Sequence, residues 1–137
     1  AYRFGLDYVQ LHGKESPAYC RSLRAAGVKL IKVFSIADSS DLKKTDEYED
    51  SCDLFLFDTQ CEQHGGSGTQ FNWCLLPSYQ GKTPFLLSGG IRMESAQALC
   101  AFNHPLLAGY DINSRFELSP GEKDSERIRT FLNNLKQ

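Results

Sequence analysis

Three glycine-rich turns are the first feature of this sequence that points to chemistry. Each follows an apolar run of strand length, and they are Gly65-Gly66-Ser67-Gly68-Thr69, Ser88-Gly89-Gly90 and Asn113-Ser114-Arg115 with Gly121 beyond it. Glycine lets backbone N–H groups approach an anion closely, and a helix N-terminus adds the positive end of its dipole. One glycine after a strand is usually only a turn. Three in consecutive loops predict a cradle for a phosphate group.

Asp58 is the residue best placed for proton transfer. Alternation along its strand puts Asp58 on one face with Leu54 and Leu56. Phe55 and Phe57 then face the other way, onto helices. Asp58 ends the strand at the carboxyl edge, where α/β folds place their sites. A carboxyl group there can act as a general acid, but the residues alone favour a helix cap or a salt-bridge partner.

Two basic residues lie within apolar segments. Alternation places His12 on one face with Tyr8 and Gln10, so this face is wet or functional. The residues alone do not separate a pocket-lining His12 from a satisfied interior histidine. Lys32 has apolar neighbours, among which an unpaired ammonium is costly. We therefore expect Lys32 to pair internally with an acidic residue rather than with a substrate carboxylate.

The elements that position these residues alternate regularly along the chain. The apolar runs of strand length are Leu6–Leu11, Val28–Phe34, Leu54–Phe57, Pro84–Leu87 and Leu106–Ile112. Four helical patterns lie between or after these runs. The first begins at the cap Ser16-Pro17 and stops at Gly27, and a weaker, charged one covers Asp38–Tyr48. The third covers Met93–Phe102 with Ala96, Leu99 and Cys100 on one face, and the fourth follows the cap Asp124 with Ile128, Phe131, Leu132 and Leu135 on one face. Parallel strands need long return segments, so this alternation predicts an α/β fold with right-handed crossovers.

Two architectures fit five strand–helix units. The 137 residues give about 27 per unit, and eight such units need about 220, within the usual range of an eight-stranded barrel. The segment 1–5 looks like the last turn of a helix ending at a glycine, so the chain opens in mid-pattern. The chain is either a five-stranded doubly wound domain of the flavodoxin type or the last five units of an eight-unit barrel.

Composition excludes several classes of protein. The formal charge is −2, from 15 Lys+Arg against 17 Asp+Glu, which favours neither a nucleic acid nor an anionic membrane as partner. No apolar run approaches the roughly 18 residues of a membrane span, and no secretory signal is present, so we expect a soluble cytoplasmic protein. The five cysteines are scattered and predict reduced thiols. Cys61 and His64 lie close together, but two ligands do not make a metal site.

Four motifs, in this order, resemble one known family over essentially the whole chain. They are Leu6-Asp7-Tyr8-Val9-Gln10-Leu11-His12-Gly13; Leu56-Phe57-Asp58-Thr59 followed by the Gly65–Trp73 segment; Leu87-Ser88-Gly89-Gly90-Ile91; and Asp111-Ile112-Asn113-Ser114 with Pro120-Gly121-Glu122-Lys123-Asp124. Their order and spacing are similar to those of phosphoribosylanthranilate isomerase. The resemblance implies a (β/α)8 TIM barrel and an Amadori rearrangement in tryptophan biosynthesis, from an aminoaldose phosphate to an aminoketose phosphate, without a cofactor.

The resemblance also implies which part of the barrel is present. Residues 1–137 would be the C-terminal part of a single barrel domain, truncated to strands four to eight, and the first three βα units would be absent. The family's general base is a cysteine in a Cys-Gly motif at the end of strand one, and none of the five cysteines here matches it. A substrate-binding basic residue after the family's second strand is missing as well.

Site residues follow from the resemblance, position by position. Asp58 matches the general acid, and the residues expected to bind substrate or its phosphate are His12, Gly66, Ser67, Gly68, Ser88, Gly89, Gly90, Asp111, Asn113 and Ser114. Asp111 and Asn113 would hold sugar hydroxyls or brace their loop. Arg115 stands where the family more often has glycine, and a positive φ would be awkward there for arginine, so either the turn differs or the family tolerates it. Phe71 and Trp73 are expected in the core, and no metal is expected.

Three functions remain open at this point. The chain represents phosphoribosylanthranilate isomerase; or it is a catalytically incompetent barrel fragment that at most binds a phosphate ligand; or it is another enzyme among the phosphate-binding barrels, which the motifs disfavour. The expected ligand is a small phosphorylated molecule. Five barrel strands leave two open sheet edges, which predicts association with another copy or with the missing N-terminal segment.

Overall fold

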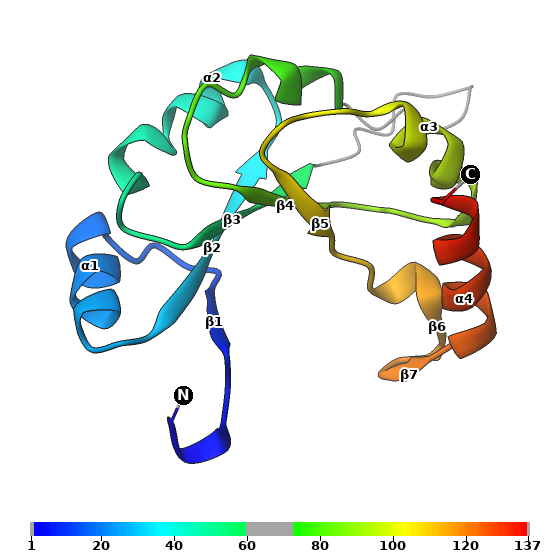
Figure 1. Cartoon of the computed structure of the whole chain (residues 1–137), viewed down its shortest axis with the longest axis horizontal. Helices are drawn as coiled ribbons and strands as arrows, with labels where there is room; N and C mark the ends of the chain where they lie inside the picture. The colour runs from blue at the N-terminus through cyan, green and yellow to red at the C-terminus, as the bar shows by residue number, and fades with distance from the viewer. Residues whose placement is uncertain (1, 60–72, 137) are drawn as a thin grey trace.

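A five-stranded parallel sheet forms the centre of the fold (Figure 1). The computed structural model describes residues 2–59 and 73–136. The strands are β1 (Tyr8–Leu11), β2 (Lys29–Ile36), β3 (Leu54–Thr59), β4 (Phe85–Ser88) and β5 (Leu107–Tyr110). They lie side by side in chain order, and every neighbouring pair is parallel. The five predicted strands are therefore confirmed, with bounds that shift by at most two residues.

The strand order excludes one of the two architectures. A flavodoxin-type domain reverses its strand order at a switch point, with the order 2-1-3-4-5. The order β1-β2-β3-β4-β5 has no such reversal. The doubly wound alternative was therefore wrong, and the sheet has the sequential order of a barrel wall.

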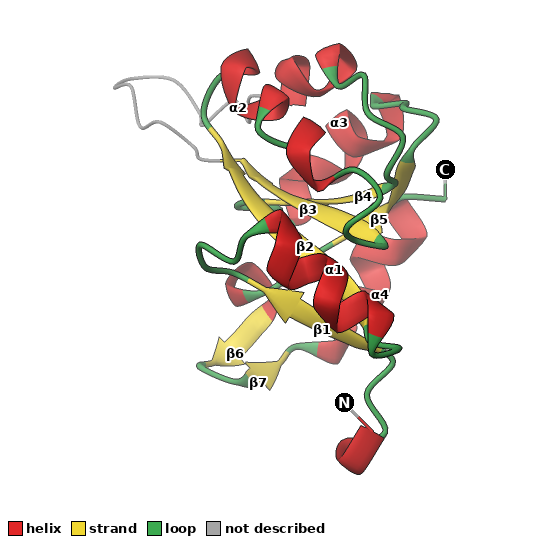
Figure 2. Cartoon of the chain, turned by 90° about the vertical axis from the view of Figure 1, so that its left-hand side faces the viewer, coloured by secondary structure: helices red, strands yellow, loops and turns green. Residues whose placement is uncertain are grey.

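Helices cover the outer side of the curved sheet, as Figures 1 and 2 show. The α-helices are α1 (Pro17–Ala25), α2 (Ser39–Lys43), α3 (Ala96–Ala101) and α4 (Ser125–Asn134). Shorter 3-10 helices are η1 (Tyr2–Phe4), η2 (Asp46–Tyr48), η3 (Trp73–Ser78), η4 (Met93–Ser95) and η5 (Ser114–Phe116). An unpredicted antiparallel hairpin, β6 (Glu117–Ser119) and β7 (Glu122–Lys123), lies between η5 and α4. None of the helices in the described parts of the chain is long and apolar enough to cross a membrane.

Two of the predicted helix starts are confirmed in atomic detail. The Ser16 side chain accepts a hydrogen bond from the Tyr19 N–H at 3.2 Å, with Pro17 in the first turn. Asp124 accepts from the Arg127 N–H at 2.9 Å and starts α4. Each side chain satisfies an N–H group that has no partner within its own helix.

Two other helix predictions need correction. The segment Asp38–Tyr48 is not one helix, because α2 ends at Lys43 and η2 begins at Asp46. The pattern over Met93–Phe102 is a 3-10 turn, η4, followed by the α-helix α3. Ala96 and Leu99 are buried as expected, but Cys100 is exposed and its thiol donates to the Asn134 carbonyl at 3.4 Å.

The core lies between the outer face of the sheet and the helices. Phe55 and Phe57 are fully buried there and contact Tyr79 edge to face, and the Phe57 and Phe85 ring centroids are 4.8 Å apart. The opposite face carries Asp58, which the strand register places between Ser35 and Ser88. The predicted alternation is therefore confirmed: phenylalanines fix β3 on the helices, and this leaves Asp58 on the inner face.

Candidate active site

A cleft of about 270 Å³ opens at the carboxyl ends of the strands. Parallel strands end at one edge of their sheet, so side chains from distant parts of the sequence meet there. The lining residues are Gln10 on β1 and His12 directly after it, Leu56 and Asp58 on β3, Ser88, Gly89, Gly90 and Ile91 at the end of β4, and Asp111, Asn113, Ser114 and Arg115 after β5.

The cleft brings together eight of the eleven residues expected to act on substrate. They are Asp58, His12, Ser88, Gly89, Gly90, Asp111, Asn113 and Ser114. Gly66, Ser67 and Gly68 lie outside the described residues, as do Cys61, His64 and Phe71. Trp73 is buried, as expected. The eight lining residues lie far apart in the sequence, so the fold, rather than any local motif, assembles this cleft.

Asp58 lines the cleft as a half-buried carboxylate. Within residues 2–59 and 73–136, no group donates a hydrogen bond to it or forms an ion pair with it. The helix-cap and salt-bridge roles that the residues alone favoured therefore find no partner in the described part of the chain. A carboxylate on the inner face, without such a partner, is placed to exchange a proton with a ligand.

Ser88 and Asp111 join the ends of two neighbouring strands. The Ser88 hydroxyl donates to Asp111 Oδ2 at 2.8 Å, and the Asp111 N–H donates to the Leu87 carbonyl at 2.8 Å. Gly89 and Gly90 follow with φ of 97° and 58°, a conformation that side chains other than glycine rarely adopt. The loop after β4 is thus a tight turn whose start is fixed to the loop after β5.

The loop after β5 is braced from its far side. Asn113 Oδ1 accepts a hydrogen bond from Lys123 Nζ at 2.5 Å, and the same ammonium pairs with Glu117 at 2.6 Å. Asn113 therefore braces the hairpin β6–β7, one of its two expected roles. Phe116 is buried and its ring centroid lies 4.9 Å from that of Phe131 on α4. These contacts hold the backbone of Ser114 at the cleft.

Arg115 does not adopt the backbone conformation that a glycine would bring. Asp50 is the only non-glycine residue with positive φ in the described chain. Arg115 instead lies in the 3-10 helix η5, and its carbonyl accepts from Arg127 Nη1 at 3.1 Å. Arg115 therefore meets no left-handed backbone strain in this turn. The exposed Arg115 forms no ion pair with any described residue, and it is the single Lys or Arg that lines the described cleft.

Sequence reasoning missed three lining residues. Leu56 shares the face of Asp58, so alternation was a sufficient signal for it. Ile91 and Arg115 follow directly after predicted glycine and serine positions. Nothing in their residue types shows which way a loop side chain points, and only the fold of each turn decides it.

The thiols of the described chain take no part in the cleft. Cys20 and Cys52 are buried free thiols, and Cys100 is an exposed free thiol. Burial, with the neighbouring Cys20, raises the pKa of Cys52 to about 12, so its thiol stays protonated and unreactive at neutral pH. No described cysteine is placed to act as a base on a ligand in the cleft.

Lys32 lies on the other side of the sheet from the cleft. Its Nζ is 3.2 Å from Glu15 Oε2 and donates to the Gly13 carbonyl at 2.8 Å. The expected internal pair with an acidic residue is therefore confirmed. The geometry excludes Lys32 from direct contact with a ligand in the cleft.

The arrangement suits proton transfer on a small anion. Two carboxylates, an imidazole and two serine hydroxyls surround one opening, beside a turn of two glycines and a guanidinium. Carboxylates and imidazole move protons, whereas glycine turns and arginine bind phosphate oxygens.

Comparisons with known proteins agree on one family. The family described as N-(5'phosphoribosyl)anthranilate (PRA) isomerase matches residues 1–134. The N-(5'-phosphoribosyl)anthranilate isomerase of Phocaeicola vulgatus is 56% identical over all of this chain, which covers 67% of that relative. The enzyme of the same name from Parabacteroides distasonis is 53% identical over 98% of this chain, and 61% of that relative is covered. The chain thus spans between about three fifths and two thirds of these relatives' length.

Solved structures give the same result. Phosphoribosyl anthranilate isomerase from Thermotoga maritima superposes with a TM-score of 0.78 at 32% identity, over 96% of this chain and 62% of that one. A structure of the isomerase in complex with reduced 1-(o-carboxyphenylamino)-1-deoxyribulose 5-phosphate gives 0.75 at 29% identity, over 96% of this chain and 60% of that one. At 11% identity and a TM-score of 0.65, 3-hexulose-6-phosphate synthase shares the fold alone.

Proposed function

Because this chain belongs to the N-(5'-phosphoribosyl)anthranilate isomerase family, we propose that its cleft supplies the proton donor and part of the phosphate cradle of that isomerase. The reaction is the Amadori rearrangement of N-(5-phosphoribosyl)anthranilate to 1-(2-carboxyphenylamino)-1-deoxyribulose 5-phosphate in tryptophan biosynthesis. The observation that carries the proposal is the meeting of Asp58 with Ser88, Gly89 and Ser114 in one cleft.

Within the barrel, the chain corresponds to strands four to eight. Five of eight units is about five eighths of a barrel, which agrees with the 60 to 67% of relatives and solved chains that the sequence spans. The sequential parallel order of β1 to β5 also fits one continuous arc. Residues 1–137 would then be the C-terminal part of a single barrel domain. The complete protein is then this chain together with the remaining barrel units.

Asp58 is the general acid in this proposal. It donates its proton to the furanose ring oxygen as the C1–O bond breaks, which leaves a Schiff base between C1 and the anthranilate nitrogen. A base then removes the C2 proton, and the electron pair forms an enolamine that ketonises. The base is the family's cysteine, which would lie in the barrel units outside this sequence. The chain of 137 residues would therefore bind but not turn over.

The phosphate occupies the end of the cleft formed by the loops after β4 and β5. Gly89, Gly90 and Ser114 bring backbone N–H groups and a hydroxyl to it. The motif resemblance assigns the same role to Gly66, Ser67 and Gly68, which lie outside the described residues. Asp111 fixes the Ser88 hydroxyl at 2.8 Å. Arg115 adds a guanidinium, which matches the paired oxygens of a phosphate.

The opposite side of the cleft receives the rest of the substrate. Gln10 on β1 and His12 in the loop directly after it line the cleft together with Asp111 and Asn113. Imidazole and carboxamide groups bind sugar hydroxyls or a carboxylate through hydrogen bonds. His12 would orient the substrate so that its ring oxygen faces Asp58.

Replacing Asp58 by asparagine in the complete protein tests this function. Asparagine keeps the shape but cannot donate an acidic proton, so kcat should fall about 10²-fold or more while the thermal melt is unchanged. Asp50→Asn is the matched control, because Asp50 is exposed, lies away from the cleft and has the positive φ that asparagine tolerates. Near wild-type turnover by Asp58→Asn would remove the assigned acid.

A second candidate function concerns the chain by itself. Its coverage of about two thirds of its relatives and the lack of a Cys-Gly motif favour a fragment that binds a phosphate ligand without catalysis. We expect no isomerisation by the 137 residues alone, assayed at high protein concentration. Appreciable turnover by this chain would refute that reading and would require a base among its own residues.

A further inference from the structure

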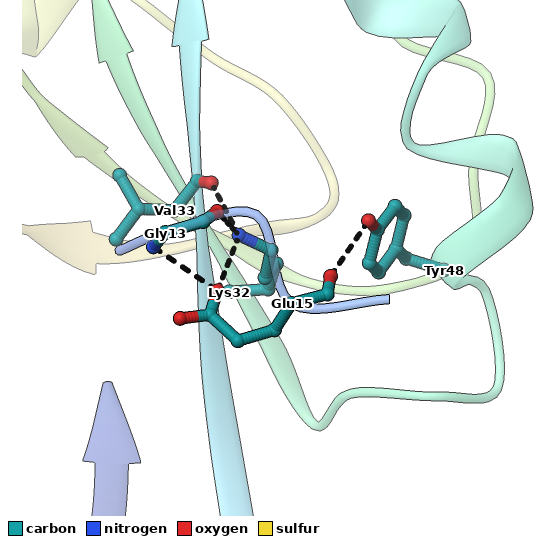
Figure 3. A network of polar contacts seen from close by, with 5 residues as sticks. All are labelled: Gly13, Glu15, Lys32, Val33 and Tyr48. Atoms are coloured by element: carbon teal, nitrogen blue, oxygen red, sulfur yellow. Dashed lines mark hydrogen bonds and ion pairs between the residues drawn. The ribbon is translucent and has the colours of Figure 1, made fainter. Parts of the chain in front are cut away.

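A network of polar contacts joins Lys32 and Glu15 to Gly13, Val33 and Tyr48 (Figure 3). Strand alternation places Lys32 on the helix-facing side of the sheet, opposite the cleft. Lys32 is 3% exposed, and its ammonium donates to the Gly13 carbonyl at 2.8 Å, lies 3.2 Å from Glu15 Oε2 and reaches the Val33 carbonyl at 3.4 Å. Its Nζ also lies 5.6 Å and 5.9 Å from the ring centroids of Phe34 and Tyr48. The three donors of the ammonium thus all have acceptors, and two aromatic faces complete its surroundings.

Two of these acceptors belong to the loop that joins β1 to α1. Glu15 Oε2 also accepts from the Gly13 N–H at 3.0 Å, and the Glu15 carbonyl accepts from the Tyr48 hydroxyl at 2.8 Å. Both peptide groups of Gly13 are therefore held, the N–H by Glu15 and the carbonyl by Lys32. The loop has no helix or strand of its own, so this network is what fixes it.

His12 lies between two anchored residues. Leu11 on its N-terminal side pairs with Lys32 in the β1–β2 ladder, and Gly13 on its C-terminal side is held by the network. The side chain of His12 points to the other face of the sheet, where it lines the cleft. The backbone of His12 therefore has little freedom to move its imidazole away from a bound ligand.

We propose that Lys32 is a positioning residue that, together with Glu15, holds His12 in its place in the cleft. Lys32 touches no substrate and acts only through the Gly13–Glu15 loop. A buried ion pair adds little net stability compared with apolar residues of similar size. The effect of the Lys32 charge is therefore to fix the position of the Gly13–Glu15 loop. The inference rests on the proposed function, because the effect requires His12 to bind substrate.

A double-mutant cycle in the complete protein separates positioning from simple stabilisation. Lys32→Met should lower kcat/KM about tenfold, because a small misplacement of a binding group greatly lowers the reaction rate. In a His12→Ala background the same substitution should lower kcat/KM by less than about twofold, because the positioned group is gone. An equal loss in both backgrounds, or a folded Lys32→Met with wild-type kinetics, would overturn the proposal.

A milder variant covers the case in which Lys32→Met does not fold. A Cβ added at Gly13 would lie 2.7 Å from Glu15 Oε1, so Gly13→Ala must shift the flexible Glu15 carboxylate, whose Oε2 contacts Gly13 and Lys32, while every charge is kept. This variant should show the same coupling to His12, and additive kinetics would contradict the proposal. The control is Arg24→Met, which removes another ion pair of 3.1 Å, to Asp53, and should leave kcat/KM unchanged.

The same measurements separate a failure of the proposed function from a failure of the positioning role of Lys32. If the complete wild-type protein does not isomerise the substrate, the proposed function fails. If it does, and Lys32 and His12 act independently, the function stands and only the positioning role is wrong.

Discussion

At the scale of single residues, a substitution of Arg115 tests substrate binding separately from the proton transfers. It lines the end of the cleft to which we assign the phosphate, without an ion-pair partner in the described chain, and it takes no part in the proposed proton transfers. Arg115→Ala in the complete protein should raise KM about three- to tenfold with little change in kcat, because an exposed guanidinium gives a modest, uniform gain in binding. Steady-state kinetics measure this, with Arg129→Ala on the exposed face of α4 as control. An unchanged KM would show that Arg115 faces solvent in the complex.

Residue-level prediction succeeded where a side chain had few physical alternatives. Lys32 had to find a partner because its neighbours are apolar, and Glu15 provides it. Asp58 and Leu56 had to share a face because strand alternation leaves no other choice. Prediction failed for Arg115, whose direction depends on a turn that closes through Phe116 and α4.

The N-terminus of α2 carries a pH-dependent cap. The pKa of Asp41 is lowered, first by the hydrogen bond from Lys44 and then by the Ala37 and Asp38 N–H groups. The pKa of Asp38 is lowered by hydrogen bonds from Ser40. A carboxylate whose pKa is lowered in the folded state stabilises the protein at pH values above its ordinary pKa of 3.8. This stabilisation is lost as the pH falls through the folded-state pKa.

Asp41→Asn should therefore destabilise the protein at neutral pH and matter progressively less below pH 3.8. Urea unfolding of wild type and variant at a series of pH values gives the difference directly. A difference that stays constant down to the lowest pH would show that the loss comes from packing and not from the charge.

The contact between α4 and η5 supports the loop that carries Ser114. Phe131 is 1% exposed and packs on Phe116, whereas its neighbour Leu132 is 48% exposed. Phe131→Ala should cost about 3–5 kcal/mol of unfolding free energy and raise KM, because the loop loses its support. Leu132→Ala is the control and should cost under about 1 kcal/mol. Urea denaturation and kinetics of the complete protein test both, and an equal cost for the two variants would contradict this role of α4.

Element bounds were predictable where the signal was local. Ser16 and Asp124 cap their helices through contacts three residues apart, and the sequence alone contains that spacing. The split of Asp38–Tyr48 was not predictable in this way. Thr45 is buried, and its hydroxyl and N–H both bond to the Leu42 carbonyl, so the chain tightens and leaves the α-helical path. Burial of Thr45 depends on tertiary packing, which a periodicity does not contain.

At the scale of the whole molecule, β1 and β5 are the edges of the described sheet. Each pairs with one neighbour, and Phe4, Leu6 and Tyr8 are exposed near β1. Unpaired edge strands present N–H and C=O groups that other strands can satisfy. The isolated chain should therefore self-associate in sedimentation velocity and bind the remaining barrel units when these are added. A single monomer peak in sedimentation velocity and a cooperative thermal melt, both unchanged by the added units, would contradict this.

The barrel could not be chosen from periodicity alone. Five alternating units fit both architectures, and only the strand order, a property of the folded chain, excludes the doubly wound one. The motif resemblance identified the family, because it combines the order of four segments far apart in sequence. The cleft itself depends on how those segments meet in space, which the spacing of residues along the chain does not give.

The most direct test of the account is a crystal structure of the complete protein with reduced 1-(o-carboxyphenylamino)-1-deoxyribulose 5-phosphate, the ligand bound by one solved relative. We expect the phosphate between the turn Ser88-Gly89-Gly90 and Ser114, and the sugar within hydrogen-bond distance of the Asp58 carboxylate. A ligand bound elsewhere, or in this cleft with Asp58 turned away from the sugar, would contradict the assignment of Asp58 as the acid.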